Sequence, residues 1–250
     1  MLQFIHKEGK AALAKVFVVL LILNGVLFLC LPNHWFPITV LVISIVLFAF
    51  TLCFYRKPRR VYKGKLHGLV NVPTDGKVVV IEKVFERQFF NEERIQVSIF
   101  MSLFNAHANW VPVSGKITHL SHVSGNFWAA YLPKSSHENE HTNIVIETPN
   151  HGTILTKQIA GAVARRIVTY VHEDDEVLIG SPLGFIKLGS RMDIFLPVDS
   201  EIMVKLGEQV WANVTILARL PEMKSPEMKS PETKSPETKS PETKSPIMKQ

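Results

Sequence analysis

Two long apolar runs near the start of the chain limit what it can fold into more than any other feature. The first covers Ala11–Leu31 and is interrupted only by Lys15, and the second covers Phe36–Tyr55 without a charged residue. An α-helix rises about 1.5 Å per residue, so about 20 apolar residues cross a hydrocarbon core about 30 Å thick. Because only Pro32–Trp35 separates the runs, we predict an antiparallel hairpin of two membrane helices over these ranges.

Charge is distributed very unevenly around this hairpin. Basic residues flank both of its ends, while the connecting loop has none: Lys7, Lys10 and Lys15 lie at one end and Arg56, Lys57, Arg59 and Arg60 at the other. The positive-inside rule therefore places both ends in the cytoplasm and the loop outside. A cleaved signal peptide is the alternative, but the first run lacks a convincing small-residue cleavage site and a second apolar run follows directly.

The remaining chain divides into a domain and a tail. Residues 61–220 follow the hairpin region 1–60, and residues 221–250 repeat the pattern PE[MT]KS five times before a short end. Proline at every fifth position forbids a continuous helix, and few apolar residues are available for burial, so we expect a disordered spacer. The excess of basic residues lies in residues 1–66, whereas 67–220 are net acidic, which argues against a general nucleic-acid-binding surface.

The central domain is predicted to be mainly β, of barrel or sandwich type with short helices. Short apolar runs of strand character are separated by turns, and they are Lys77–Val84, Ile95–Met101, Ile144–Thr148, Thr153–Leu155, Glu176–Ile179, Arg191–Leu196 and Val214–Ala218. The segment Pro149–Gly152 is predicted to be a hairpin turn. Short helices are expected near Leu103–Ala108 and Ala162–Arg166. Neither Cys30 nor Cys53 belongs to a metal-ligand motif, and both lie in apolar runs, so no metal site is expected.

Individual motifs in the domain are not diagnostic. Thr74-Asp75-Gly76 is a common turn sequence, a lone His107 in a semi-apolar stretch is usually structural, and a Gly-Ser pair between strands is usually a turn. Together with the hairpin, however, the segments FYRKP, PTDG, IFMSLFNAHANWVPVSGKI, QIAGAVARRI and FIKLGSRMDIFLP resemble the phosphatidylserine decarboxylases, most closely their short bacterial type. The resemblance covers about residues 1–219, and LGSRMDIFLP is its most specific part.

The resemblance implies a proenzyme that cuts itself between Gly189 and Ser190. The Ser190 hydroxyl would attack the Gly189 carbonyl, and β-elimination would release a first chain that ends at Gly189. The dehydroalanine that remains would be hydrolysed, with loss of ammonia, to a pyruvoyl group at the new N-terminus. This covalent cofactor would form a Schiff base with the substrate amine and accept the electrons released with carbon dioxide. Asp75 matches the family aspartate that orients or activates the cleavage base, and His107 matches a histidine close to the substrate.

One position departs from the long-type relatives. They carry a second histidine three residues after the one that matches His107, and this chain has Trp110 there. Three accounts are open: His107 serves both steps, His122 substitutes, or Asp75 acts through water. Arginines that could bind the substrate phosphate or carboxylate are Arg165, Arg166 and Arg191, although each is also compatible with an ordinary structural or surface role.

The implied partners are membrane phosphatidylserine, which would become phosphatidylethanolamine, and the two cleaved chains, 1–189 and 190–250, as a heterodimer or higher oligomer. The implied location is the bacterial inner membrane, with the catalytic domain facing the cytoplasm. Two other functions are open. A non-catalytic membrane-anchored β-barrel adaptor explains the hairpin and domain but not the Gly189, Ser190, Asp75 and His107 pattern. A pyruvoyl enzyme for a soluble amine leaves the membrane hairpin unexplained.

Overall fold

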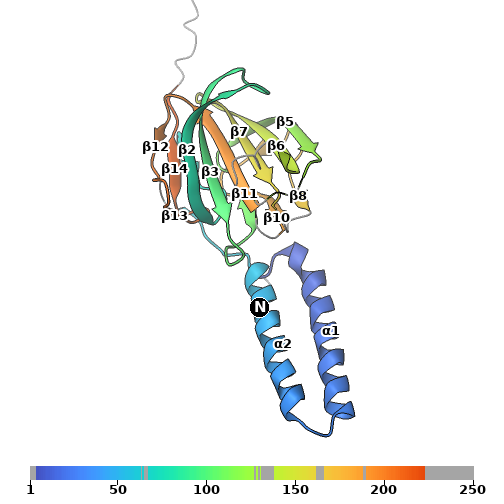
Figure 1. Ribbon diagram of the computed structural model, residues 1–250. Helices are drawn as coiled ribbons and strands as arrows, with labels where there is room; N and C mark the ends of the chain where they lie inside the picture. The colour runs from blue at the N-terminus through green and yellow to red at the C-terminus, as the bar shows by residue number, and fades with distance from the viewer. Residues whose placement is uncertain are drawn as a thin grey trace, which may run out of the picture.

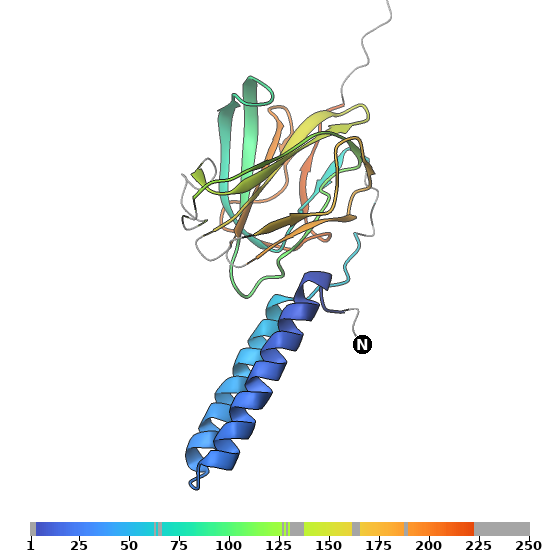
Figure 2. The same cartoon turned by 90° about the vertical axis from the view of Figure 1, so that its right-hand side faces the viewer.

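A helical hairpin projects from one end of a β domain (Figures 1 and 2). The computed structural model describes residues 4–62, 64, 67–126, 128, 130, 138–161, 166–187 and 190–222. The helices are α1 (Lys7–Cys30) and α2 (Trp35–Phe54). Their antiparallel arrangement follows from the short link, as predicted. Helix α1 begins four residues before the predicted start because His6 caps it, with its Nδ1 accepting a hydrogen bond from the Glu8 N–H at 3.4 Å.

The hairpin leaves most of its apolar surface uncovered. Leu29 is 88% exposed and Val46 is 63% exposed, and both helices are long and apolar enough to cross a membrane. The helices touch through the rings of Phe17 and Phe48, whose centroids are 5.7 Å apart, and through polar side chains nearer the tip. Apolar surface on this scale is unfavourable in water and favourable in hydrocarbon, so the hairpin suggests membrane association.

The β domain is built from antiparallel strands in three sheets. In chain order the strands are β1 (Leu69–Asn71), β2 (Gly76–Glu86), β3 (Glu92–Met101), β4 (Ala108–Trp110), β5 (Gly115–Val123), β6 (His141–Thr148), β7 (Gly152–Ile159), β8 (Ile167–Thr169), β9 (Glu176–Val177), β10 (Pro182–Ile186), β11 (Ser190–Pro197), β12 (Glu201–Ile202), β13 (Gln209–Val210) and β14 (Ile216–Arg219). The large sheet has the order β13-β2-β3-β11-β7-β6-β5-β9, and the smaller ones are β1-β14-β12 and β4-β10-β8. The predicted mainly β class is confirmed.

Strand β11 lies in the middle of the large sheet and is buried on both faces. Met192, Ile194 and Leu196 alternate into the main apolar core, as their period of two requires. Arg191 and Asp193 alternate onto the opposite face and bond to each other. The strand therefore fixes the position of its first residue, Ser190, from both sides.

Turn chemistry confirms one local prediction and overturns another. Asn150 (φ 64°) and Gly152 (φ 74°) adopt left-handed conformations in the predicted turn, which joins β6 to β7. The helix predicted over Leu103–Ala108 is wrong, because residues 103–105 form a turn. There the Asn105 side chain accepts hydrogen bonds from the N–H and the hydroxyl of Ser102, at 2.9 and 2.7 Å, which compete with helix formation. Most of the other predicted helix, residues 162–165, and the tail from 223 lie outside the described residues.

Candidate active site

Ser190 is the first residue of β11 and is completely buried. Its backbone pairs with Met101 at the end of β3, and its Oγ donates to the Met101 Sδ at 3.5 Å. A thioether is a weak acceptor, so the hydroxyl is held in place without a strong partner among the described residues. Gly189, the other half of the predicted cleavage site, lies outside the described residues.

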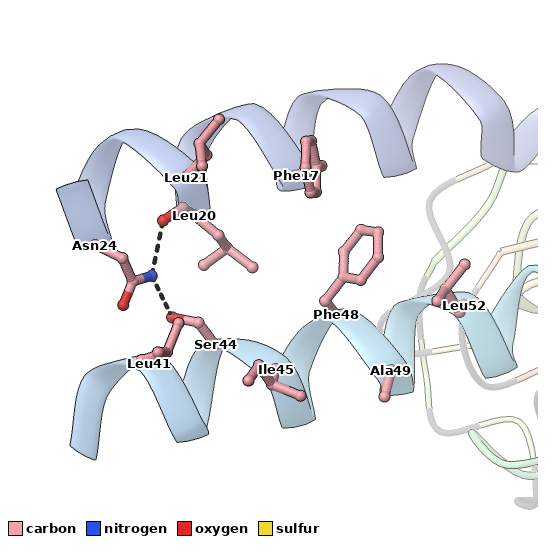
Figure 3. Close-up of a pocket in the computed structure, with 10 residues that line it drawn as sticks. All are labelled: Phe17, Leu20, Leu21, Asn24, Leu41, Ser44, Ile45, Phe48, Ala49 and Leu52. Carbon is pink, nitrogen blue, oxygen red and sulfur yellow. Dashed lines mark hydrogen bonds between the residues drawn. The ribbon is translucent and has the colours of Figure 1, made fainter. Parts of the chain in front are cut away.

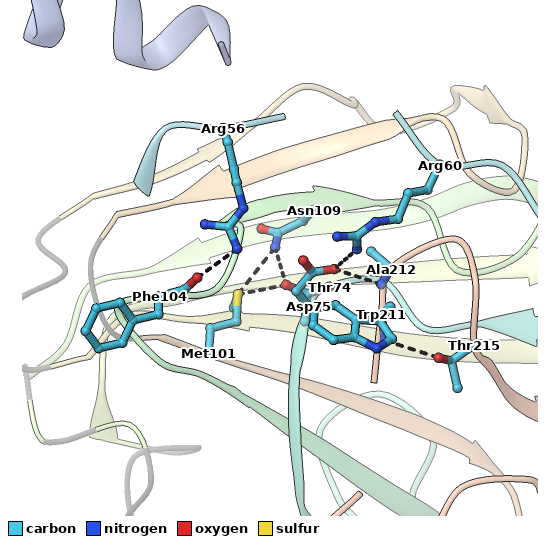
Figure 4. Close-up of polar contacts among 10 residues, drawn as sticks. All are labelled: Arg56, Arg60, Thr74, Asp75, Met101, Phe104, Asn109, Trp211, Ala212 and Thr215. Atoms are coloured by element: carbon cyan, nitrogen blue, oxygen red, sulfur yellow. Dashed lines mark hydrogen bonds and ion pairs between the residues drawn. The ribbon is translucent and has the colours of Figure 1, made fainter. Parts of the chain in front are cut away.

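The Thr74-Asp75-Gly76 segment approaches the same methionine from the start of β2. The Thr74 hydroxyl lies 2.7 Å from the Met101 Sδ (Figure 4). The same sulfur atom also contacts the Ser190 Oγ. Gly76 packs against the backbone carbonyl of Phe100, and a Cβ there would collide with it. The glycine is therefore needed for the close approach of β2 to β3, rather than for a left-handed turn.

Asp75 is fully buried and only partly satisfied. Its Oδ1 accepts from the Arg60 guanidinium at 2.5 Å and from the backbone N–H of Ala212 at 3.0 Å (Figure 4). Its Oδ2 is buried and has no hydrogen-bond partner among the described residues. A buried carboxylate oxygen without a donor is unfavourable, so this atom is available to accept a proton or a donor group.

A chain of polar side chains connects this cluster to the next strands. Asn109 Nδ2 donates to the Thr74 hydroxyl at 3.3 Å, and Gln158 Nε2 donates to Asn109 Oδ1 at 2.9 Å. The Thr169 hydroxyl in turn donates to Gln158 Oε1 at 3.0 Å. Such a network fixes the rotamers around Ser190, because each member satisfies its neighbour inside the core.

His107 lies at the boundary between the domain and the hairpin. It is fully buried, and its ring centroid lies 4.3 Å from that of Phe54, the last residue of α2. Its Nδ1 lies 3.0 Å from the Asn105 carbonyl oxygen. A carbonyl can only accept, so Nδ1 carries the proton and Nε2 is the basic nitrogen. Burial, with a smaller contribution from the Arg56 charge, lowers the pKa of His107 to about 4, so the ring is neutral at pH 7.

The backbone pairing brings His107 toward Ser190. Met101 pairs with Ser190, and six residues later the His107 carbonyl accepts from the Ile186 N–H at 3.2 Å. Met101 and His107 are only six positions apart, and the residues that pair with them, Ser190 and Ile186, are only four positions apart. His107 and Ser190 are therefore confined to the same end of the sheet, beside α2.

The other predicted residues lie apart from this arrangement. His122, on β5, is in register with Thr142, Gln158 and then Met192, which places it three strands from β11, or roughly 14 Å at the usual strand spacing. Trp110 is buried in an aromatic cluster with Phe54 and Phe185.

The arginines also differ in environment. Arg191 is 1% exposed, and its Nε donates to Asp193 at 2.5 Å and its Nη2 to the Ser98 hydroxyl at 2.7 Å. Two of the three guanidinium nitrogens are thus engaged inside the sheet, and Nη1 is buried without a hydrogen-bond partner among the described residues. Arg166 is exposed, and Arg165 lies outside the described residues. Within the described part of the chain, no three His, Cys, Asp or Glu side chains are grouped as metal ligands would be.

Comparison with known proteins assigns the chain. A family model described as phosphatidylserine decarboxylase matches residues 47–218. The chain belongs to this family. A phosphatidylserine decarboxylase proenzyme of Parabacteroides distasonis is 45% identical over 216 residues, which are 86% of this chain and 98% of the relative. Proteins of the same name from Porphyromonas gingivalis and Cytophaga hutchinsonii are each 45% identical and cover 87% and 86% of this chain, and 99% and 97% of their own lengths.

The family assignment made from the sequence motifs is therefore confirmed, and the family is one of decarboxylases that are named as proenzymes. Sequence reasoning did not find Arg60, Met101 or Asn109 as parts of the site. Arg60 carries no signal, because its role depends on packing between distant segments, whereas Met101 lies in the quoted segment IFMSLFNAHANWVPVSGKI. Asn109 lies in the motif segment that was quoted, two residues after His107, and this position was the available signal.

Proposed function

We propose that the chain is a pyruvoyl-dependent phosphatidylserine decarboxylase that matures by cutting itself between Gly189 and Ser190. Its product would be phosphatidylethanolamine. The observation that carries the proposal is Ser190, which lies fully buried beside Met101 and the Asp75 segment in a chain 45% identical to proteins named as proenzymes of this enzyme. The proposed units are a membrane hairpin (1–60), a decarboxylase domain (61–220) and a spacer tail (221–250).

The residues around Ser190 fit the formation of a pyruvoyl group. The weakly held Oγ can attack the preceding carbonyl, which converts the amide into an ester and requires a group that removes the hydroxyl proton. Among the described residues, Asp75 Oδ2 is the buried acceptor of this cluster that has no hydrogen-bond partner, so we assign Asp75 to this proton transfer, directly or through His107. A pyruvoyl group at Ser190 would supply a ketone for the substrate amine and an electron sink for decarboxylation.

His107 is proposed to move protons in both steps. The low pKa of His107 keeps the ring neutral through the physiological range, so its Nε2 lone pair is free to take a proton in transit, although the ring is a weaker base than an ordinary histidine. Its contact with Phe54 places it at the end of the hairpin where phosphatidylserine would arrive from the bilayer. Arg191 is occupied inside the sheet, so among the proposed arginines the exposed Arg166 is the better candidate for the substrate phosphate.

The proposal is tested by substitutions that separate cleavage from turnover. Ser190→Ala should leave one 28.2 kDa chain without decarboxylation, whereas Ser190→Cys should cleave slowly because a thiol can still attack the carbonyl. Ser200→Ala removes another buried serine hydroxyl just beyond β11 and should cleave normally. Denaturing electrophoresis with a carbonyl-reactive label should mark the 190–250 chain. An uncut, unlabelled and inactive wild-type protein would support the adaptor instead.

His107→Ala distinguishes the remaining alternatives for the base. We expect the chain to stay uncut, because no other histidine of the sequence lies in an equivalent family motif. If the chain is cut but does not turn over lipid, His107 acts on the substrate alone. Normal cleavage with normal turnover would contradict both roles.

The proposed location is the bacterial inner membrane with both ends of the hairpin in the cytoplasm. The asymmetry of Lys and Arg around the hairpin supports this orientation. Protease added to sealed right-side-out vesicles should therefore leave the domain intact, and it should digest the domain once the vesicles are opened. Digestion in sealed vesicles would reverse the proposed orientation.

A further inference from the structure

The two ends of the hairpin are joined by backbone pairing outside the helices. Residues 4–6 run antiparallel to residues 55–57, with a β-bridge between Ile5 and Arg56 and two hydrogen bonds of 2.7 and 2.8 Å. This pairing brings the first turn of α1 beside the segment that leaves α2. It therefore gathers basic residues that are about 50 positions apart in the sequence.

A cavity of about 640 Å³ opens at this junction. The side chains that give it its character are Lys7, Lys10, Lys57, Arg59, His6 and Tyr170. In the described part of the chain, no carboxylate lies within ion-pair distance of these four cations, although Glu8 accepts a hydrogen bond from the Tyr170 hydroxyl. Cations gathered without counter-charges repel one another, so the cavity favours an anion.

The other basic residues of the same segment are already used by the protein. Arg56 donates to the Phe104 carbonyl at 2.7 Å, and Arg60 binds Asp75 (Figure 4). The cations of the cavity are therefore not simply part of a uniform basic collar. They form a separate group: Lys7 lies 3.4 Å over the Tyr170 ring and Arg59 lies 5.4 Å from the centre of the Phe4 ring, but none of the four has a carboxylate partner among the described residues.

Two further cavities continue from this basic one along the hairpin. A cavity of about 320 Å³ shares Ile5 and Lys10 with it. That second cavity shares Phe17, Phe48 and Leu52 with a third, of about 390 Å³, between the two helices (Figure 3). The surfaces thus change from charged to apolar along one continuous path.

The far end of the path is marked by a polar contact within the helices. Asn24 Nδ2 donates to the Ser44 hydroxyl at 2.9 Å and to the Leu20 carbonyl at 2.7 Å (Figure 3). From Lys10 to Asn24 the helix rises about 21 Å, whereas half of a hydrocarbon core is about 15 Å thick. The path is therefore deep enough for an acyl chain of one leaflet.

We propose that this path binds one anionic phospholipid from the leaflet next to the domain, in addition to any substrate molecule. Its phosphodiester would lie among Lys10, Lys57 and Arg59, and one acyl chain would occupy the groove between α1 and α2. A bilayer phospholipid has the same order of charge and apolar chain, and basic pockets at the ends of membrane helices bind such headgroups.

Aromatic rings separate this site from the proposed reaction centre. His6, which lines the basic cavity, stacks on Phe185 at 4.5 Å between centroids. Phe185 contacts Phe54 at 6.0 Å, and Phe54 contacts His107 at 4.3 Å. The lipid is consequently a structural or regulatory ligand at the membrane junction rather than the molecule that is decarboxylated.

The test is lipid retention by the purified full-length protein in detergent micelles, followed by native mass spectrometry. Phosphatidylglycerol is the probe, because it is anionic and has no amine, so binding is independent of the proposed decarboxylation. The Lys57→Gln/Arg59→Gln variant should weaken binding about 30-fold, from about 1 kcal/mol for each cation near an anionic surface. The control Lys83→Gln/Arg87→Gln removes the same charges from an exposed part of the β2–β3 hairpin and should bind normally.

A second pair of variants tests the acyl-chain groove. Ala49 lines the groove, and Ala49→Leu should reduce retention at least fivefold, whereas Val46→Leu on the exposed helix surface should not. The proposal would be overturned if phosphatidylcholine were retained as well as phosphatidylglycerol. It would also be overturned if the two charge variants lost phosphatidylglycerol binding equally, or if neither lost it. Binding of glycerol 3-phosphate as tight as that of the lipid would show that a soluble phosphate ester is the ligand and would also overturn it.

Discussion

Acidification should weaken the fold through His107. The pKa of this buried ring is lowered from 6.5 to about 4, chiefly by burial, so the unfolded chain binds a proton at pH 5 that the folded chain rejects. Stability from this group is complete above pH 6.5 and is lost as the pH falls toward 4. Between pH 7 and pH 5 the loss is about 2 kcal/mol.

The effect of His107 is best measured by comparing the variant Ser190→Ala with the double variant Ser190→Ala/His107→Gln, because both should stay as single uncut chains. His6 also has a pKa lowered to about 4, mainly by burial, so it too lowers the free energy of unfolding as the pH falls. This contribution is the same in both variants and cancels in their difference. Denaturant unfolding in micelles, followed by tryptophan fluorescence, should show that Ser190→Ala loses about 2 kcal/mol more between pH 7 and pH 5 than Ser190→Ala/His107→Gln. Equal losses, or titration of the His107 ring near 6.5 by NMR, would refute the reasoning.

Three further predictions concern stability and the tail. Arg60→Gln should lower the free energy of unfolding by about 2–3 kcal/mol, because it leaves the Asp75 carboxylate buried with one backbone donor. As a control, loss of the exposed Arg219–Glu201 pair should lower it by less than about 1 kcal/mol. Gly76→Ala should cost about 1–3 kcal/mol by forcing apart β2 and β3, as judged by the same unfolding measurement. Deletion of residues 223–250 should leave lipid turnover within about tenfold of wild type, because a segment with proline at every fifth position has few apolar side chains to pack on the domain. A larger loss of turnover would indicate that the tail binds to the domain.

The helical hairpin and the central strands could be predicted from sequence because each depends on local periodicity. The run Arg191–Leu196 alternates its side chains between two faces, and the hairpin is apolar on every face. Leu103–Ala108 misled the prediction, because the hydrogen bonds of Asn105 to Ser102 outweigh helix propensity. Strands β5 and β10 were missed: β5 is interrupted by polar residues, and β10 begins with a proline.

The candidate site was predictable only where a motif marked it. Ser190 and Asp75 were identified because their motifs resemble those of a known family, and the structure places both in the core. Their partners follow from long-range packing: Asp75 is bound by Arg60 from before β1 and by the Ala212 N–H from after β13. No local pattern in the sequence could predict a hydrogen bond between residues 137 positions apart.

The contact between Phe54 and His107 has a consequence for how far a lipid would have to travel. Under the proposed function, the proton-transferring ring lies directly on the last residue of a membrane helix. A reaction centre farther from the membrane end of the domain would require part of each acyl chain to leave the hydrocarbon core of the bilayer, at a cost of about 0.8 kcal/mol per CH₂ group. Lifting five such groups would cost about 4 kcal/mol and reduce the reactive population roughly a thousandfold. With His107 at the membrane end, the serine headgroup can react while its chains remain dissolved in the bilayer, and the enzyme can search for substrate by lateral diffusion alone.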